Sequence, residues 1–495
     1  MNRTKFFITL LAVLTLISAS FATNGTRLIG FGVKMNGRGG TGIGVFDSPS
    51  LMMTNPAGIA FMEGAGVGVN FGALMPIVKF KNNLNDKTGD ANTYPTGGIG
   101  YVSDRSPMKK LSWGIGLFTL GGMGADFKLN HALYKDASGN YIPQTYHSKL
   151  GTIQVGPSFA YKFNDKFAAG ISLHLFYSQL EFEMPFSMPP SFLQGIAQPG
   201  VTFGQMFASP PLSYTELTAA AKMSDLTAIS FGGKIGFAYK PCEKLSLGFN
   251  YSSPVTLTHK NGKATMDMSA QFNDAFAKMV GAYVGAGMPV DTARARVLAS
   301  FAAMGINPAL GMEDEYNLEA ELINPQSIGI GVGFKATEKL TVACDVEYIN
   351  WKDAYEKMAL SLKNGKNANI NRLMGINGDF NVDFPMEWKD AIMFRIGLEH
   401  KCTDKFTGRV GYAFGSNPVP SETVFSIFPA IVESHITLGG TYDFTQAMSL
   451  HIAYETTLNK SQTASNPSKI ASEYNGSTSQ LAGGFVNIGF AWKLR

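Results

Sequence analysis

One short phrase recurs five times along this 495-residue chain and constrains its fold more than any other feature. Each copy begins with a ring-bearing residue, continues through turn-forming polar residues that usually include lysine, and leads into an alternating run. The copies occupy residues 161–167, 239–245, 334–340, 400–406 and 442–448. Because each lies between two apolar–polar alternating runs, the phrase predicts a tight hairpin between long antiparallel strands. Such hairpins on one side, with long loops on the other, are typical of a closed membrane barrel.

The alternation also assigns side chains to faces, because successive side chains of a strand point in opposite directions. One face is apolar and rich in aromatic residues, as in Leu245, Leu247, Phe249 and Tyr251. The opposite face carries charges among small residues, namely Lys234, Asp345, Glu347, Arg395, Glu399, Arg409, His451 and Glu455. A soluble β-sheet protein would also alternate, but these runs are longer and carry aromatic residues at their ends. Lipid outside and a polar lumen inside explain both features.

The predicted fold class is therefore all-β, a transmembrane antiparallel β-barrel of about fourteen strands spanning residues 64–495. The alternating segments lie near residues 65–80, 93–104, 111–127, 149–163, 166–183, 224–240, 244–262, 318–336, 339–353, 388–401, 405–417, 435–444, 448–460 and 483–495. An even count suits a single-chain bacterial barrel.

The N-terminus predicts export. An apolar run from Phe6 to Ala22 follows Arg3 and Lys5, so residues 1–22 are interpreted as a signal peptide that is cut before Thr23. No other stretch approaches the roughly 20 apolar residues that a spanning helix needs. An exported chain with membrane-type strands belongs in the outer membrane of a bacterium. The net charge of +4 does not favour a nucleic-acid partner.

Two connections between the predicted strands are long and apolar. Residues 184–223 are rich in Pro, Met and Phe, and residues 264–317 contain two stretches with the spacing of short amphipathic helices. Both connections are expected on the extracellular side. Their apolar side chains predict a cap in which the loops pack on each other, and the same surface could also form a landing groove for an apolar ligand.

Residues 23–63 precede the first strand and do not alternate. Their Gly-rich run, residues 37–44, lacks the Gly-Lys-Ser/Thr of a phosphate-binding loop. A piece of about 40 residues with this composition cannot form a core of its own. It is therefore expected to pack inside the wide lumen as a hatch.

Several motifs in this order resemble the FadL-type outer-membrane transporters of long-chain fatty acids and related hydrocarbons. The resemblance covers nearly the whole mature chain. The first of these motifs is the triplet Asn55, Pro56 and Ala57 in the expected hatch. The others occupy residues 113–127, 348–351, 388–390 and 411–420.

The resemblance implies a fourteen-stranded barrel with an N-terminal hatch and a lateral gap at a kink in the third strand. The residues themselves support the kink, because Gly121, Gly122 and Gly124 cluster in the third predicted strand. Glycine inside a strand weakens pairing and permits bulges. The implied mechanism is passive diffusion of an apolar ligand through the lumen and sideways into outer-membrane lipid. The chain is expected to be a monomer without cofactor or metal.

The nature of the ligand stays open in the sequence. A fatty acid would favour a basic partner, yet the upper part of the fifth predicted strand is acidic. His174, Lys234, Arg395 and Arg409 face inward by parity and are the candidate contacts for a ligand head group. Alternatively they form lumen ion pairs with Asp345, Glu347 and Glu399, and the ligand is a neutral hydrocarbon.

The sequence also bears on three other functions. An enzyme is not expected, because none of the seven histidines lies in a Ser-His-Asp or metal-ligand context. A general porin conflicts with the expected hatch and the apolar loops. An adhesin or purely structural barrel remains an alternative that only uptake measurements separate.

Overall fold

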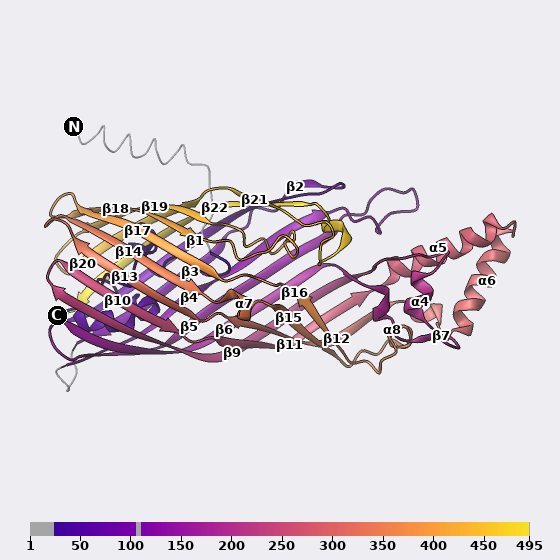
Figure 1. Cartoon of the computed structure of the whole chain (residues 1–495), viewed down its shortest axis with the longest axis horizontal. Coiled ribbons are helices and arrows are strands. Elements are labelled where there is room, and N and C mark those ends of the chain that lie inside the picture. Colours follow the sequence, from indigo (N-terminus) through magenta and orange to yellow (C-terminus); the bar gives the residue numbers. More distant parts are fainter. Residues whose placement is uncertain (1–23, 105–109, 495) are drawn as a thin grey trace.

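The recurrent hairpins lie at one end of a closed barrel, and the long connections extend from the other end (Figure 1). The computed structural model describes residues 24–104 and 110–494. Over these residues the wall has 14 antiparallel strands, and the last strand pairs with the first. The predicted fold class is confirmed. The signal peptide predicted for residues 1–22 lies outside the described residues.

Most wall strands are continuous, and four consist of two collinear pieces. In chain order they are β1 (Ala65–Lys81), β3 (Tyr94–Ser103), β4 (Leu111–Leu129), β5 (Gln144–Lys162), β6 (Phe167–Met188), β9 (Leu217–Cys242), β10 (Leu245–Ser252) with β11 (Val255–Asp267), β12 (Glu313–Asn324) with β13 (Ser327–Lys335), β14 (Leu340–Ile349) with β15 (Lys357–Lys363), β16 (Phe380–Pro385) with β17 (Ala391–Lys401), β18 (Phe406–Gly415), β19 (Ser434–Asp443), β20 (Met448–Thr457) and β22 (Thr478–Leu494). The barrel is closed where β1 pairs with β22 from Ala65↔Leu494 to Lys81↔Thr478.

Two segments predicted as single strands are interrupted by proline. Pro254 separates β10 from β11, and Pro325 separates β12 from β13, because proline lacks the N–H that a ladder needs. The strand predicted over residues 339–353 ends earlier, at Ile349, and is followed by the short helix α7 (Trp351–Ala354). The hairpin of β15 and β16 was not predicted, since its strands are short and a helix, α8 (Ala368–Met374), lies between them.

The two long connections contain fewer residues than predicted, because the flanking strands are longer. β6 and β9 stay paired up to Met188↔Leu217, so the first connection contains only η2 (Pro190–Phe192), β7 (Ile196–Gln198), β8 (Val201–Thr202) and α4 (Phe203–Ala208). The second contains α5 (Ser269–Gly285), α6 (Val290–Ala303) and η3 (Pro308–Leu310), which confirms the helices expected there. Figure 1 shows α5 and α6 projecting beyond the barrel. Of the helices in the described residues, none is long and apolar enough to cross a membrane.

The predicted faces of the wall are confirmed. Apolar side chains such as Phe231 (77% exposed) and Ile229 (67% exposed) point away from the barrel. The charged side chains Asp345, Glu347 and Glu455 are buried on its inner face. This arrangement suits an apolar solvent outside and a protein-filled lumen inside.

Residues 24–63 lie inside the barrel near the hairpin end (Figure 1). This N-terminal segment contains α2 (Val33–Gly37), α3 (Leu51–Thr54) and η1 (Pro56–Phe61). α2 contacts β18, β19, β20 and β22, whereas η1 contacts β4, β5, β6 and β9. The segment therefore touches opposite sides of the wall. Three further short elements, β2 (Asp86–Thr88), β21 (Lys460–Thr463) and η4 (Ser472–Tyr474), lie at the other end of the barrel.

Candidate functional site

The third wall strand, β4, separates from its neighbour β3 halfway along its length. The two strands pair from Ser103↔Trp113 up to Gly98↔Phe118, and the ladder ends there. Beyond this point the remainder of β3 pairs only with β1, up to Leu74↔Tyr94. The wall is therefore not joined by strand pairing between β3 and the second half of β4.

On its other side β4 stays paired with β5, but the register shifts between Thr119 and Gly121. An extra residue of this kind bends a strand and turns it out of the regular wall. The predicted glycine cluster lies at and just after the shift. The three glycines also leave room for neighbouring atoms that lie very close to the backbone of β4. An added Cβ would overlap the Thr26 carbonyl at Gly121, the Leu150 carbonyl at Gly122 and the Tyr94 hydroxyl at Gly124.

The beginning of the N-terminal segment lies against this bend from inside. Arg27 forms an antiparallel bridge with Gly121, and the Leu28 N–H donates to the Leu120 carbonyl at 3.3 Å. The side chain of Arg27 is held in turn by Glu347 on the far wall, at 3.1 Å. One short stretch of backbone thus covers the inner side of the place where β3 and β4 part.

A cavity of about 320 Å³ lies at the same place. Its inner end is lined by Leu28, Ala430 and Leu481, which are buried in the lumen. Its outer end is lined by Gly151 and Ile153, on the lipid-facing side of β5. The cavity therefore reaches from the lumen to the outer surface of the wall, and we call it the wall cavity.

The lining of the wall cavity is mostly apolar. Lys149 is the one charged side chain among the lining residues, and its Nζ lies 2.9 Å from Glu181 Oε1. Tyr177 and Gln179 supply hydroxyl and amide groups at the outer lip. On the outer face of β5 and β6, the charged pair Lys149 and Glu181 lies on the extracellular side of Ile153, and apolar side chains such as Phe159 lie on the side of the hairpins. The outer lip therefore lies at a boundary between polar and hydrocarbon surroundings.

The four basic residues predicted as head-group contacts lie elsewhere. None of them lines the wall cavity. Arg395 pairs with Glu347 at 2.8 Å, Arg409 pairs with Glu399 at 2.6 Å, and Lys234 donates to the Met53 carbonyl at 2.6 Å. His174 is buried on the inner face of β6, 6.4 Å from the ring of Phe176.

The triplet predicted as the hatch motif lies at the centre of the N-terminal segment. Asn55 is fully buried, and its Nδ2 donates to the carbonyls of Ile43 (3.0 Å) and Phe237 (2.9 Å). Its Oδ1 accepts from the Ala57 N–H, so Asn55 also caps η1 at Pro56. One amide thus joins two parts of the N-terminal segment to the wall strand β9.

Asn55→Ala is expected to loosen residues 24–63 without unfolding the barrel. The substitution leaves buried carbonyl and N–H groups unpaired, which costs about 1–3 kcal/mol. Hydrogen exchange followed by mass spectrometry should show faster exchange of the N-terminal segment and unchanged exchange of the wall. The control is Asn317→Ala, since the Asn317 side chain accepts a hydrogen bond from Lys263 in an exposed pair. Equal exchange in wild type and Asn55→Ala would contradict this structural role.

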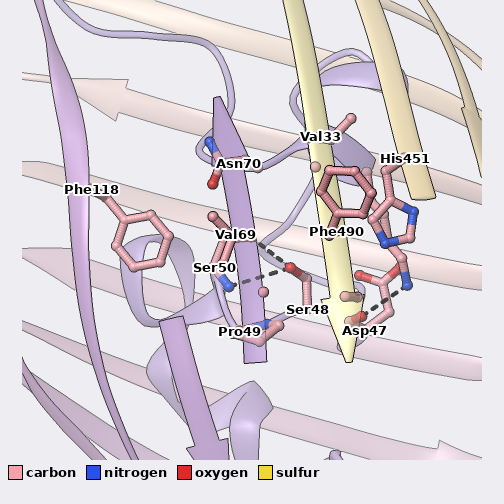
Figure 2. A pocket seen from close by; sticks show the side chains of 15 residues that line it. Val33, Asp47, Ser48, Pro49, Ser50, Val69, Asn70, Phe118, His451 and Phe490 are labelled. Atoms are coloured by element: carbon pink, nitrogen blue, oxygen red, sulfur yellow. Dashed lines mark hydrogen bonds and ion pairs between the residues drawn. The ribbon is translucent and has the colours of Figure 1, made fainter. Parts of the chain in front are cut away.

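A second pocket lies between the N-terminal segment and the wall strands β1 and β22 (Figure 2). It measures about 50 Å³. Phe118 lines one side, and His451 and Phe490 line the other. Lys34 bonds the Asp47 carbonyl within it, at 3.2 Å. At about 50 Å³ the pocket is far smaller than the roughly 150 Å³ cavity that holds benzene, so it is too small for a hydrocarbon ligand.

The upper lumen is filled by a feature that the sequence did not predict. The connection from β18 to β19 turns inward, and its residues 423–432 are buried without interruption. They pack beside the rings of Trp388, Phe384 and Tyr474. The apolar run Thr423–Val432 between turn-forming residues was the available signal.

A buried carboxyl group joins the last extracellular connection to the wall. The Tyr146 hydroxyl of β5 donates to Glu473 Oε2 at 2.6 Å. Burial raises the pKa of the Glu473 carboxyl from 4.5 to about 8. The protonated form is therefore the one that fits this position at neutral pH.

Glu473→Gln is expected to make the stability of residues 464–477 independent of pH. In the wild type the stabilisation is complete below pH 4.5 and is lost as the pH rises through about 8, because the folded pKa is raised. Glutamine keeps the hydrogen bond and does not ionise. Hydrogen exchange between pH 5 and pH 9, corrected for intrinsic rates, measures the difference. Glu313→Gln, on an exposed residue, is the control. The same pH dependence in wild type and Glu473→Gln would contradict the assignment.

Comparison with known proteins gives a consistent picture. A family model described as "Outer membrane protein transport protein (OMPP1/FadL/TodX)" matches residues 10–489. A curated relative is an uncharacterized protein of Chlorobium limicola, from the 5′ region of a phosphoenolpyruvate carboxykinase gene. It is 40% identical over 82 residues. That match covers 16% of this chain and 40% of the relative's own length.

Three solved structures share the fold. The Pseudomonas putida toluene transporter TodX has a TM-score of 0.66 at 16% identity, covering 95% of this chain and 100% of that one. A Pseudomonas aeruginosa FadL homologue has a TM-score of 0.68 at 14% identity, with the same coverage. The Ralstonia pickettii toluene transporter TbuX has a TM-score of 0.63 at 18% identity, covering 94% and 99%.

Proposed function

Because this chain belongs to the outer membrane transport protein family described as OMPP1/FadL/TodX, we propose that it takes up neutral hydrocarbons and releases them sideways through the wall cavity. The family consists of transport channels and not enzymes, and the barrel is an outer-membrane transporter of hydrophobic compounds. Neutral hydrocarbons as the ligand class, and lateral release through the wall, are proposed beyond this general function. The observation that carries it is the cavity that reaches both faces of the wall where β3 and β4 part.

The chemistry of the wall cavity favours a neutral ligand. A dry apolar cavity of about 150 Å³ is enough for benzene, so a volume of about 320 Å³ accommodates a small hydrocarbon. A carboxylate in this cavity would have only Lys149 as a cationic partner, and Lys149 is paired with Glu181. An unpaired carboxylate in apolar surroundings is strongly disfavoured.

The basic residues deeper in the lumen support the same choice. Arg395, Arg409 and Lys234 already bond a carboxylate or a carbonyl of the protein. A fatty acid would have to displace one of these partners and leave it buried. Long-chain fatty acids remain the alternative ligand. TodX and TbuX carry the name toluene transporter, which agrees with a neutral aromatic hydrocarbon.

In the proposed route the ligand moves down its own concentration gradient. Arg27 and Leu28 must give way, because their backbone covers the inner side of the bend in β4. Gly121 permits that backbone to lie directly on the strand. The hydrocarbon then passes from lumen to lipid without crossing water, where its exposed apolar surface would be unfavourable.

Uptake of radiolabelled toluene and oleate by cells with and without the protein tests the proposal. Faster uptake of toluene alone is the expected result. Faster uptake of oleate alone would shift the ligand to fatty acids. No difference for any hydrophobic compound would contradict transport of these ligands and favour an adhesin. A large steady conductance of the purified protein in planar bilayers would instead favour an open porin.

A further inference from the structure

The inward connection between β18 and β19 lies across the lumen, above the wall cavity. We call its residues 423–432 the lumen segment. Every residue from Thr423 to Val432 is buried, although a connection on this side of a barrel ordinarily faces water. No sheet pairing of the described residues includes the lumen segment. It is therefore a loop that lies in the core without belonging to the wall.

Aromatic packing holds the lumen segment against opposite sides of the barrel. The ring of Phe425 lies 6.2 Å from Phe182 on β6 and 5.2 Å from Phe384 on β16. Phe428 lies 6.2 Å from Trp388. Phe182 and Phe384 also contact each other, at 5.8 Å, although β6 and β16 are not neighbours in the wall. Phe425 therefore packs into a cluster of three rings that spans the lumen.

Directional bonds to the lumen segment from the wall are few. The Ser148 hydroxyl of β5 donates to the Ile427 carbonyl, and the Thr423 hydroxyl donates to the Met386 carbonyl beside β16, at 2.5 Å. The hydroxyls of Ser426 and of Tyr474 in η4 lie 3.3 Å apart. Two bonds within the segment, from Ala430 N–H to Phe428 and from Ile431 N–H to Pro429, make it locally tight. Displacement of the segment would therefore break side-chain packing and a few hydrogen bonds but no strand pairing.

Apolar space lies on both sides of the lumen segment. Below it Ala430 lines the wall cavity. Above it a small apolar pocket is lined by residues that include Phe186, Met223 and Val382. Phe186 contacts Phe384, and Phe384 contacts Phe425, so the pocket and the segment share one aromatic chain. The lumen segment thus adjoins both apolar spaces, since Ala430 lines the wall cavity and Phe425 reaches the lining of the upper pocket through Phe384.

We propose that the lumen segment is an inner gate that an apolar ligand displaces on its way from the upper pocket to the wall cavity. The inference rests on the proposed function, since it assumes entry from the extracellular end. A hydrocarbon can replace the contacts that Phe425 and Phe428 give up, whereas water or an ion cannot. The gate would therefore open when an apolar ligand is present and stay closed in its absence.

Cysteine labelling tests the gate. Ser426 is fully buried in the lumen segment, and Ser426→Cys is a small change. The three native free cysteines, Cys242, Cys344 and Cys402, are first replaced by serine. A membrane-impermeant maleimide is then applied to cells with and without toluene. The expected result is labelling that is slow without toluene and several-fold faster with it.

Two controls sharpen the outcome. Ser158→Cys places a thiol at an equally buried position on the inner wall beside the N-terminal segment, and its labelling should not respond. Ser148→Ala, which removes the bond to Ile427, should speed the labelling of Ser426→Cys even without toluene. Labelling of Ser426→Cys that toluene does not change, or an equal response at Ser158→Cys, would overturn the gate.

The test is separable from that of the exit. Gly151 lines the outer end of the wall cavity and not the gate. If filling the wall cavity at Gly151 stops uptake while the labelling of Ser426→Cys ignores toluene, the gate alone fails. If filling it leaves uptake normal while labelling still responds, the lateral exit alone fails.

Discussion

Gly151→Phe is expected to abolish toluene uptake while the barrel still folds. Gly151 lies at the outer end of the wall cavity, opposite Gly122 on β4 and Gln179 on β6. A Cβ there meets no atom within 4 Å, so the new ring can occupy the outlet without strain on the wall. Uptake of radiolabelled toluene by cells that carry equal amounts of folded protein is the measurement.

The matched control is Gly233→Phe. Gly233 is also lipid-facing, on β9, and its added Cβ makes only ordinary contacts at 3.5 Å or more. It lies outside the lining of the wall cavity. Normal uptake by Gly151→Phe would remove the lateral exit. Gly122 and Gly124 are poor test positions because an added Cβ would collide with Leu150 or Tyr94 and disturb the wall itself.

Arg38→Ala is expected to free the N-terminal segment from the wall. The Arg38 guanidinium is fully buried and lies 2.7 Å from both Asp47 and Glu399. Its removal leaves two carboxylates that share only Arg409 and the more distant Lys34. Breaking a buried pair costs on the order of 3 kcal/mol, and each 1.4 kcal/mol is tenfold in an equilibrium. Amide hydrogens of residues 28–58 should therefore exchange about a hundredfold faster.

Lys357→Ala provides the comparison for that experiment. Lys357 and Asp383 form a pair of similar length, 2.6 Å, but both side chains are about half exposed. Such surface pairs contribute at most about 1 kcal/mol. Exchange in residues 28–58 should match the wild type in this variant. Unchanged exchange in Arg38→Ala would show that the N-terminal segment is held by packing and not by its charges.

The wall could be predicted from the sequence because its cause is local. Period-two alternation assigned Asp345 and Glu347 to the inside, and the structure confirms both. The exposed side chains of Phe231 and Ile229 follow the same alternation on the lipid side. The glycine cluster in the third strand also stood out. Its reason, which is contact with Thr26, Leu150 and Tyr94 from three other segments, is not local and could not be read from spacing.

The wall cavity and the lumen segment could not be predicted from the sequence for the same reason. Leu28, Gly151, Ala430 and Leu481 come from four distant parts of the chain and have nothing in common but their final position. The inward charges were identified correctly, but parity cannot say which partner each charge finds. The Glu347 carboxylate, for example, bonds Arg395 on the neighbouring strand and also Arg27 of the N-terminal segment, which is more than 300 residues away in the sequence.

The outer lip of the wall cavity has a consequence for the energetics of uptake. If the ligand leaves between Lys149 and Ile153, as proposed, it would go from external water to membrane hydrocarbon without equilibrating with the periplasm. The driving force is then the free energy of transfer of the ligand from water to hydrocarbon, which becomes more favourable by about 0.8 kcal/mol with each CH₂ group. Net flux would stop when the membrane around the barrel is loaded, whatever the concentration in the cell. Consumption inside the cell would matter only by draining that lipid reservoir.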